Sequence, residues 1–350
     1  MIQAKPSRDE WRSLYLAAVD FKRSACWEWM YDSDIFGVVD PETGETAYCC
    51  IMGNGGEHFA VAGYLGVEGL NGILGLLSGE IDPESSDSMF IQKCLMCSFE
   101  DRAFLTAGDL KTIKELGLKF RGRNEWPLFR HHEPGFVPWF LNAAQCRFLT
   151  HILRQALEVA LRCRNSKEFL DHETPFTFLI RVCQKSEVGE VEWVDQYITA
   201  ELYEPEFVSF NVQNEIFLKK LNAFKPKQNL ILEADIYYAP TPVREDARPY
   251  FPKVGVLLDH HSGLAVSFEM MKDIQEEGYK CVDMLVNFIE QNRLIPAKML
   301  VARVETYYLY LDVCKQLGLP LEMVEHLEYA DEFRNEVFDQ LVDPHGSERW

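Results

Sequence analysis

The chain has 350 residues, 47% of them hydrophobic, and a formal net charge of −20 at pH 7. So many apolar residues exclude a disordered chain, and the length is sufficient for two packed domains. Both parts of the chain are acidic, with 33 acids and 23 bases up to residue 225 and 22 acids and 12 bases after it. Binding to a phosphate backbone needs clustered lysine and arginine, so the charge argues against a nucleic-acid partner.

The N-terminus carries no apolar run of signal-peptide length, and no segment approaches the ~20 apolar residues of a membrane span. The ten cysteines are scattered, and many lie within apolar patterns. Disulfide-stabilised secreted domains are shorter and denser in cysteine. We therefore expect a cytoplasmic protein with reduced cysteines and no membrane partner.

Residues 1–225 alternate between helical and extended patterns, which predicts an α+β domain with a largely antiparallel sheet. Helices are expected where apolar side chains recur every three or four positions, over residues 8–30, 67–80, 106–118 and 143–164. Strands are expected between turn signals, over residues 34–40, 45–53, 57–66, 88–101, 174–185 and 190–200.

Glycine occupies every third position from Gly63 to Gly75, in the segment AGYLGVEGLNGILG. A phosphate-binding loop would need Lys-Ser or Lys-Thr after its glycines, and neither is present. The preceding turn, Gly53–Gly56, leads into Glu57 and His58, and a carboxylate there would repel phosphate. We therefore interpret the glycines as a turn with positive φ followed by close helix packing. Glu57 and His58 remain candidate ligand-binding residues.

The segment CWEWMYDSDIFGVVDPETGETAYCCIMGNGGEHFAVAGYLGVEGLNG resembles the opening domain of an uncharacterised bacterial family. The resemblance covers roughly residues 10–80 and is most specific in the stretch GEHFA followed by YLG and EGL. This family brings no known reaction, so the resemblance implies relatives and no chemistry.

Two further motifs have the spacing of metal or catalytic sites. Cys94 and Cys97 have zinc-knuckle spacing, but a structural zinc needs four ligands, and positions three apart on a strand face opposite sides. We expect free thiols and no bound metal. The histidine pairs in FRHHEPG (129–135) and LLDHHSG (257–263) are predicted to lie in turns. The second resembles the Asp-His-His motif of a phosphoesterase superfamily, but the D-x-D pattern of that superfamily is absent upstream.

Residues 226–350 predict an α/β domain with a mixed sheet, in the order β-β-β-α-β-α-β-α. Strands are expected over residues 229–240, 253–259, 264–271, 298–304 and 321–327. Helices are expected over residues 273–294, 307–318 and 329–341. The domain boundary is expected near residues 220–228, with FKPKQN (224–229) as a polar hinge.

This order is similar to the ribonuclease-H-like fold of retroviral integrases and transposases. LEADIYYAPTPV resembles their first strand, whose catalytic aspartate would be Asp235. MLVARVETYYLYLDVCKQLGLPLEMV resembles the strand with the second acid, here Glu305, and the helix after it. The third acid would be Glu336 or Asp339 on the last helix. The resemblance implies carboxylates that hold two Mg²⁺ ions for phosphoryl transfer.

Three features of the sequence depart from that pattern. The second acid is Glu305 where those enzymes usually have aspartate, and Thr306-Tyr307 replaces the Asn-Gly or Arg-Gly after it. VGVLLDHHSGLAVSFEM resembles their second and third strands, with Gly263 in place of the arginine of their Asp-x-x-Ser-Arg turn. With the acidic charge, these departures favour a degenerate domain that has lost this chemistry.

We therefore expect a non-catalytic cytosolic binding or regulatory protein, with an unidentified protein or small molecule as partner and no cofactor. The alternative is a metal-dependent phosphoryl-transfer enzyme of nuclease or integrase type that uses Mg²⁺ and the carboxylates at 235, 305 and 336 or 339. In either case Asp235 and Glu305 are expected to lie close together. They should be partly solvated or paired with a base such as Arg303 or Lys298. Asp235→Asn is then expected to leave stability unchanged or slightly raised, by removing repulsion.

Overall fold

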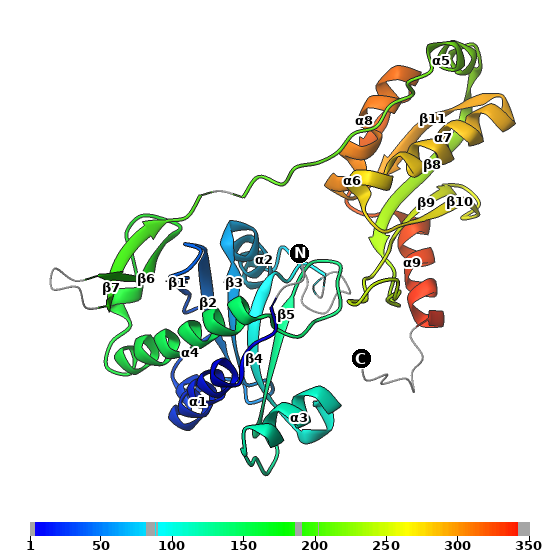
Figure 1. Ribbon diagram of the computed structural model, residues 1–350. Helices are drawn as coiled ribbons and strands as arrows, with labels where there is room; N and C mark the ends of the chain where they lie inside the picture. Colours follow the sequence, from blue (N-terminus) through cyan, green and yellow to red (C-terminus); the bar gives the residue numbers. More distant parts are fainter. Residues whose placement is uncertain (1–3, 82–87, 89, 186–190, 202, 342–350) are drawn as a thin grey trace. The chain divides into compact units, whose positions relative to one another are not determined.

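The computed structural model describes residues 4–81, 88, 90–185, 191–201 and 203–341 (Figure 1). The described residues form two compact units. Unit 1 contains the chain up to Pro134 and Pro138–Tyr203, and unit 2 contains Gly135–Val137 and the chain from Glu204. Within the described ranges no helix is long and apolar enough to cross a membrane.

Unit 2 begins earlier in the sequence than the predicted boundary near residues 220–228. Val208, Phe210 and Val212 pack against the core of unit 2. The backbone N–H of Val212 also donates to Gln316, at 2.8 Å. The apolar residues at every second position of this segment therefore attach it to unit 2, before the first helix of that unit begins.

Unit 1 is built on a seven-stranded sheet in the order β5-β4-β3-β2-β1-β6-β7. Among the described strands of this sheet only the pair β1–β6 is parallel, so the predicted largely antiparallel sheet is confirmed. The strands are β1 Phe36–Val39, β2 Thr46–Met52, β3 Ala60–Leu65, β4 Cys94–Glu100, β5 Trp126–His132, β6 Thr177–Lys185 and β7 Val191–Thr199.

The position of the first histidine pair was predicted wrongly. His131 and His132 belong to β5 and pair with Leu95 and Cys94 of β4. Pro127 and Phe129 are the buried residues of this strand, and they alternate with partly exposed ones. The strand ends in polar residues that resemble a turn, and for this reason it was not predicted from the sequence.

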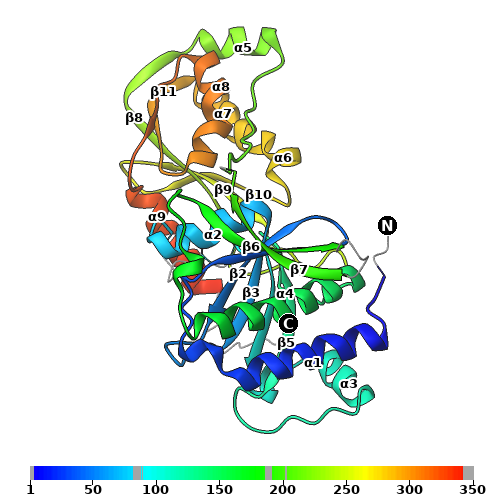
Figure 2. The same cartoon turned by 90° about the vertical axis from the view of Figure 1, so that its left-hand side faces the viewer.

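The described residues of unit 1 form the α-helices α1 Arg8–Ser24, α2 Gly66–Ser78, α3 Ala107–Glu115 and α4 Ala143–Cys163. Helices α1 and α4 run beside each other along one face of the sheet (Figure 2) and share its main core. Helix α2 packs on the opposite face. A capping box at Ser7 begins α1, which ends before Ala25 because that residue is left-handed, with φ 51°.

The glycine run serves close packing, as interpreted from the sequence. A Cβ on Gly69 would lie 2.8 Å from the backbone oxygen of Lys93, and one on Gly72 would lie 3.2 Å from that of Ile91. A Cβ on Gly63 would lie 2.6 Å from Ile152 of α4. Helix α2 therefore lies close to the chain before β4 because its facing positions have no side chain.

Unit 2 contains a five-stranded mixed sheet in the order β10-β9-β8-β11-β12. Strands β8, β9 and β10 pair antiparallel, whereas β8, β11 and β12 pair parallel. The strands are β8 Lys225–Tyr238, β9 Lys253–Asp259, β10 Ala265–Met271, β11 Leu294–Val301 and β12 Leu321–Met323. Residues 225–227, expected in a hinge, instead begin β8 opposite residues 294–296 of β11.

Helices cover both faces of this sheet (Figure 1). One face packs against α5 Glu215–Asn222, α6 Ile274–Glu277, α7 Tyr279–Asn292 and α8 Val304–Leu317, and the other packs against α9 Glu328–Leu341. One helix was predicted over residues 273–294, but the chain divides at Gly278 into α6 and α7. A Cβ on Gly278 would lie 2.6 Å from the ring of Phe210.

Candidate functional site

The carboxylates predicted from the sequence belong to three elements of unit 2. Asp235 lies near the end of β8, and Glu305 lies in the first turn of α8, just after β11. Glu336 is exposed on α9. Asp339 belongs to the same helix, but its side chain lies outside the described part of the structure. Because β8 and β11 are parallel neighbours, Asp235 and Glu305 both follow the carboxyl end of the sheet's parallel part.

Asp235 is a buried carboxylate, only 1% exposed, and it is held by two arginines. The Nε of Arg303 lies 3.0 Å from its Oδ1, and the Nη1 of Arg334, from α9, lies 3.7 Å from its Oδ2. The backbone N–H of Ile236 also donates to Oδ1 at 2.9 Å. Burial raises the pKa of Asp235, and the attraction of the two guanidinium groups opposes that rise without cancelling it.

Glu305 has a cation of its own. The Nζ of Lys253, at the start of β9, lies 2.6 Å from both carboxylate oxygens of Glu305. Lys253 also lies over the ring of Tyr238, 5.0 Å from its centroid. Of the two bases expected near these acids, Arg303 does contact Asp235, whereas Lys298 pairs with Glu322 at 2.7 Å.

A third carboxylate, Glu233, was missed by the sequence analysis. It is fully buried and faces the same side of β8 as Asp235. Its Oε2 accepts the backbone N–H groups of Tyr329 and Ala330, at 3.1 and 2.8 Å, and therefore caps the first turn of α9. Its Oε1 lies 2.6 Å from the Nδ1 of His260. One feature of the sequence could have indicated this role. Glu233 precedes Asp235 by two positions, so both acids lie on the same face of a strand that a helix must cover.

These contacts form one charged cluster between β8, α9 and the start of α8. Glu233 binds the N-terminal turn of α9, and Asp235 binds Arg334 one to two turns further along that helix. The cluster therefore attaches α9 to the sheet. Among the described residues, no group of three or more His, Cys, Asp or Glu side chains is placed to hold a metal ion.

Tyr237 continues the same face of β8 beneath α9. Its hydroxyl is buried and has no hydrogen-bond partner among the described atoms, and its ring lies 6.4 Å from that of Phe338. Burial, with a further contribution from the charge of Asp235, raises the pKa of Tyr237 to about 12. This hydroxyl therefore stays protonated at neutral pH.

The candidate ligand residues of unit 1 lie apart from any cluster of this kind. Glu57 and His58 are exposed in the segment before β3, and the Nδ1 of His58 lies 3.9 Å from Glu100. Cys94 and Cys97 are buried on opposite faces of β4, in separate cores, as the strand spacing predicted. Burial raises the pKa of both thiols.

The second histidine pair lies in a turn, as predicted. His260 and His261 connect β9 to β10, and Asp259 accepts the backbone N–H groups of His261 and Ser262 at 3.0 and 2.8 Å. This pattern is an Asx turn. Both the carboxylate of Asp259 and the ring of His260 are therefore engaged in local or capping contacts.

Two models of domains of unknown function match parts of the chain, one within each unit. Residues 11–181 match a domain of unknown function (DUF7309), and residues 217–338 match a second one (DUF6930). No curated protein matches the chain. The chain is therefore similar to two domains of unknown function, one in its N-terminal part and one in its C-terminal part.

Proposed function

We propose that this protein is a non-catalytic binding or regulatory protein. In unit 2, the carboxylates that would hold catalytic metal ions instead anchor a helix. The observation that carries this proposal is the pairing of buried Asp235 with Arg303 and Arg334. Two guanidinium groups occupy the surroundings in which a metal-dependent enzyme would need a divalent cation.

We further propose that unit 2 has a ribonuclease-H-like arrangement. Three consecutive antiparallel strands, followed by parallel strands connected through helices, support this proposal. The position of Asp235 in the first strand of the unit also agrees with the resemblance. A fold of this kind does not determine function, so the proposed non-catalytic function depends on the contacts of the individual acids.

A two-metal phosphoryl-transfer site needs several carboxylates directed at the ions. Here Asp235 is paired with two arginines and Glu305 with Lys253. A divalent ion would have to displace these cations or lie next to them, and like charges at that distance repel. A polyanionic substrate would also approach a strongly acidic chain.

An activity assay of the full chain tests this proposal. Fluorescent DNA, RNA and RNA–DNA hybrid substrates are incubated with Mg²⁺ or Mn²⁺ and wild-type protein, Asp235→Asn, Glu305→Gln or Glu325→Gln. Glu325 is the control because it is an exposed acid between β12 and α9. We expect no metal-dependent hydrolysis above background with any of the four proteins. Hydrolysis by wild type and Glu325→Gln that disappears in Asp235→Asn and Glu305→Gln would establish the alternative, a phosphoryl-transfer enzyme with bound Mg²⁺.

A further inference from the structure

We infer that the free edge of β10 in unit 2 binds an extended, positively charged segment of a partner protein, which adds to the sheet as a further strand. This inference rests on the proposed function, since it specifies what the binding protein binds.

Strand β10 is the outermost strand of its sheet and pairs with β9 alone among the described strands. Soluble proteins usually protect such edges with charged residues, proline or a covering element, because the unpaired backbone groups can join another strand. Here Phe268 is 63% exposed, Met270 is 49% exposed, and Leu264 just before the strand is 70% exposed. An uncovered edge with large apolar side chains is suited to strand addition.

Phe268 lies on the face of β10 opposite Ser267 and Glu269, which line a hollow beside α7, whereas Met270 also lines a second hollow. Phe268 and Met270 are paired with Val256 and Val254, whose side chains belong to the core beneath α9. Phe268 and Met270 therefore extend this face of the sheet beyond the residues that α9 covers. An added strand could bury its own alternate side chains against them.

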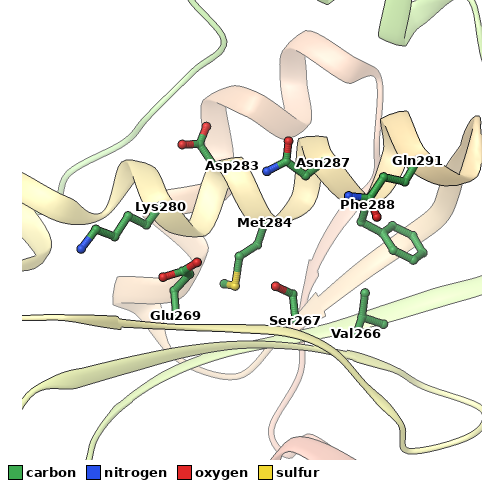
Figure 3. Close-up of a pocket in the computed structure, with 9 residues that line it drawn as sticks. All are labelled: Val266, Ser267, Glu269, Lys280, Asp283, Met284, Asn287, Phe288 and Gln291. Atoms are coloured by element: carbon green, nitrogen blue, oxygen red, sulfur yellow. The ribbon is translucent and has the colours of Figure 1, made fainter.

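On the opposite face, β10 and α7 enclose a hollow of 330 Å³. Figure 3 shows Glu269 and Ser267 directed from the strand towards the helix, and Met284 and Phe288 directed from the helix towards the strand. A second hollow of 460 Å³ continues past residues 270–272, and Lys280 lines both. The groove thus follows the length of β10 and is lined by both apolar and polar side chains.

The groove is strongly acidic. Six carboxylates line the two hollows, against two lysines, which are Lys272 and Lys280. The acids are Glu245, Glu269, Asp273, Glu276, Glu277 and Asp283. Both lysines are already paired with acids, Lys280 with Glu277 and Lys272 with Asp246 and Glu245. Glu269 and Asp283 pair with no cation among the described side chains, so the groove favours a cationic occupant.

A second copy of the chain fits this edge less well. Pairing of two β10 strands would bring the two acidic grooves and their Glu269 side chains together, and like charges at an interface disfavour association. A segment in which lysine or arginine alternates with apolar residues would satisfy both faces. Its basic side chains would lie in the groove, and its apolar side chains would cover Phe268 and Met270.

Selection from a random peptide library tests the inference. Peptides of about ten residues, long enough to span β10, are selected against the full chain, and their dissociation constants are measured by fluorescence anisotropy. We expect enriched peptides in which lysine or arginine alternates with apolar residues, without proline. Binding should weaken about tenfold or more in Glu269→Lys, weaken as salt is added, and remain unchanged in Glu325→Lys, the charge-matched control beyond β12.

Backbone pairing is tested separately. The same peptides with N-methyl groups on alternate residues have no backbone N–H donors along one edge of the extended chain. We expect these peptides to lose binding although their charge is unchanged. Equal binding to wild type, Glu269→Lys and Phe268→Lys would overturn the inference. So would a concentration-dependent dimer that Phe268→Lys abolishes, because that result would identify a second copy as the occupant. Neither result involves Asp235, so failure here is distinguishable from failure of the proposed function, which the hydrolysis assay reports.

Discussion

The Nε of Arg303 lies 3.0 Å from the Oδ1 of Asp235, an acid buried beneath α9. This pairing indicates a structural role for the two acids that resemble catalytic residues. Asp235 and Glu305 each have a cation, Arg303 for the first and Lys253 for the second. Through these ion pairs the two acids help to attach helices to the sheet. Each acid interacts mainly with its cation, and repulsion between the two carboxylates is not the dominant interaction.

The difference in stability between wild type and Asp235→Asn should depend on pH. Burial raises the pKa of Asp235, so its ionised form costs the folded state stability above that raised pKa. Asparagine removes this cost and weakens the pairing with the arginines, so at neutral pH we expect a free energy of unfolding within about 1 kcal/mol of wild type. As pH falls through the raised pKa towards the ordinary aspartate range, folded wild type takes up a proton and gains stability relative to the variant.

Urea unfolding of both proteins between about pH 4 and pH 7 measures this difference. The control is Asp312→Asn on α8. A difference between wild type and Asp235→Asn that stays constant over the whole range would show that Asp235 has no raised pKa in the folded protein.

Removal of the Glu233 carboxylate should loosen the start of α9. Loss of a side-chain cap costs about 0.5–2 kcal/mol, and Glu233→Ala also leaves the N–H groups of Tyr329 and Ala330 without their acceptor. Hydrogen exchange followed by mass spectrometry should show faster exchange in the first turn of α9. Glu233→Gln, which keeps one acceptor oxygen, should have a smaller effect. Exchange in α9 that is the same in Glu233→Ala and in the control Glu325→Ala would contradict the capping role.

One glycine-to-alanine substitution in the glycine run should lower stability, although this change usually raises it within a helix. Glycine to alanine inside a helix normally stabilises by about 1 kcal/mol. In Gly69→Ala the new methyl would meet backbone atoms of Lys93 and Tyr64 at 2.8 Å, so we expect a loss of about 1–3 kcal/mol instead. Gly108→Ala in α3 is the matched control, because its added Cβ would meet other atoms only at 3.5 Å or more. Thermal unfolding that ranks Gly69→Ala above wild type would refute the close approach of α2 to the chain just before β4.

The thiols should divide sharply in reactivity. Nine of the ten cysteines are buried, and only Cys183 is partly exposed. Because thiolates are the reactive form and burial raises the pKa of Cys94 and Cys97, we expect one fast-reacting thiol per native chain and none in Cys183→Ser. Titration with a thiol reagent, before and after denaturation, measures this. Elemental analysis should also find no stoichiometric zinc, whereas one zinc per chain that Cys97→Ser removes would make these cysteines ligands.

Local pattern was sufficient for much of the fold. The alternation in residues 229–240 predicted β8 and both of its faces, and Thr106 predicted the start of α3, where a capping box is found. The glycine spacing from Gly63 to Gly75 predicted the packing of α2. These features depend on neighbours within a few positions, which a single sequence records.

Contacts between residues far apart in the sequence have no such local pattern. Glu233 accepts the N–H of Tyr329 from 96 positions away, and Arg334 reaches Asp235 from a helix that follows the rest of the sheet. No spacing rule connects residues so far apart. The resemblance drew attention to the acids at 235 and 305, but it contained no signal that Arg334 and Lys253 would neutralise them. The same reason explains the misplaced hinge at 224–229, since β8 continues there only because β11 lies beside it.

The most direct test of the central claim is a titration of the full chain with Mn²⁺, in which the free ion is followed by electron paramagnetic resonance. If Asp235 is held by Arg303 and Arg334, wild type and Asp235→Asn should leave the same concentration of free Mn²⁺ at every point. Weak binding to the acidic surface would then be common to both proteins. A site in wild type that binds one Mn²⁺ per chain, and that Asp235→Asn lacks while Glu325→Gln retains it, would contradict the account.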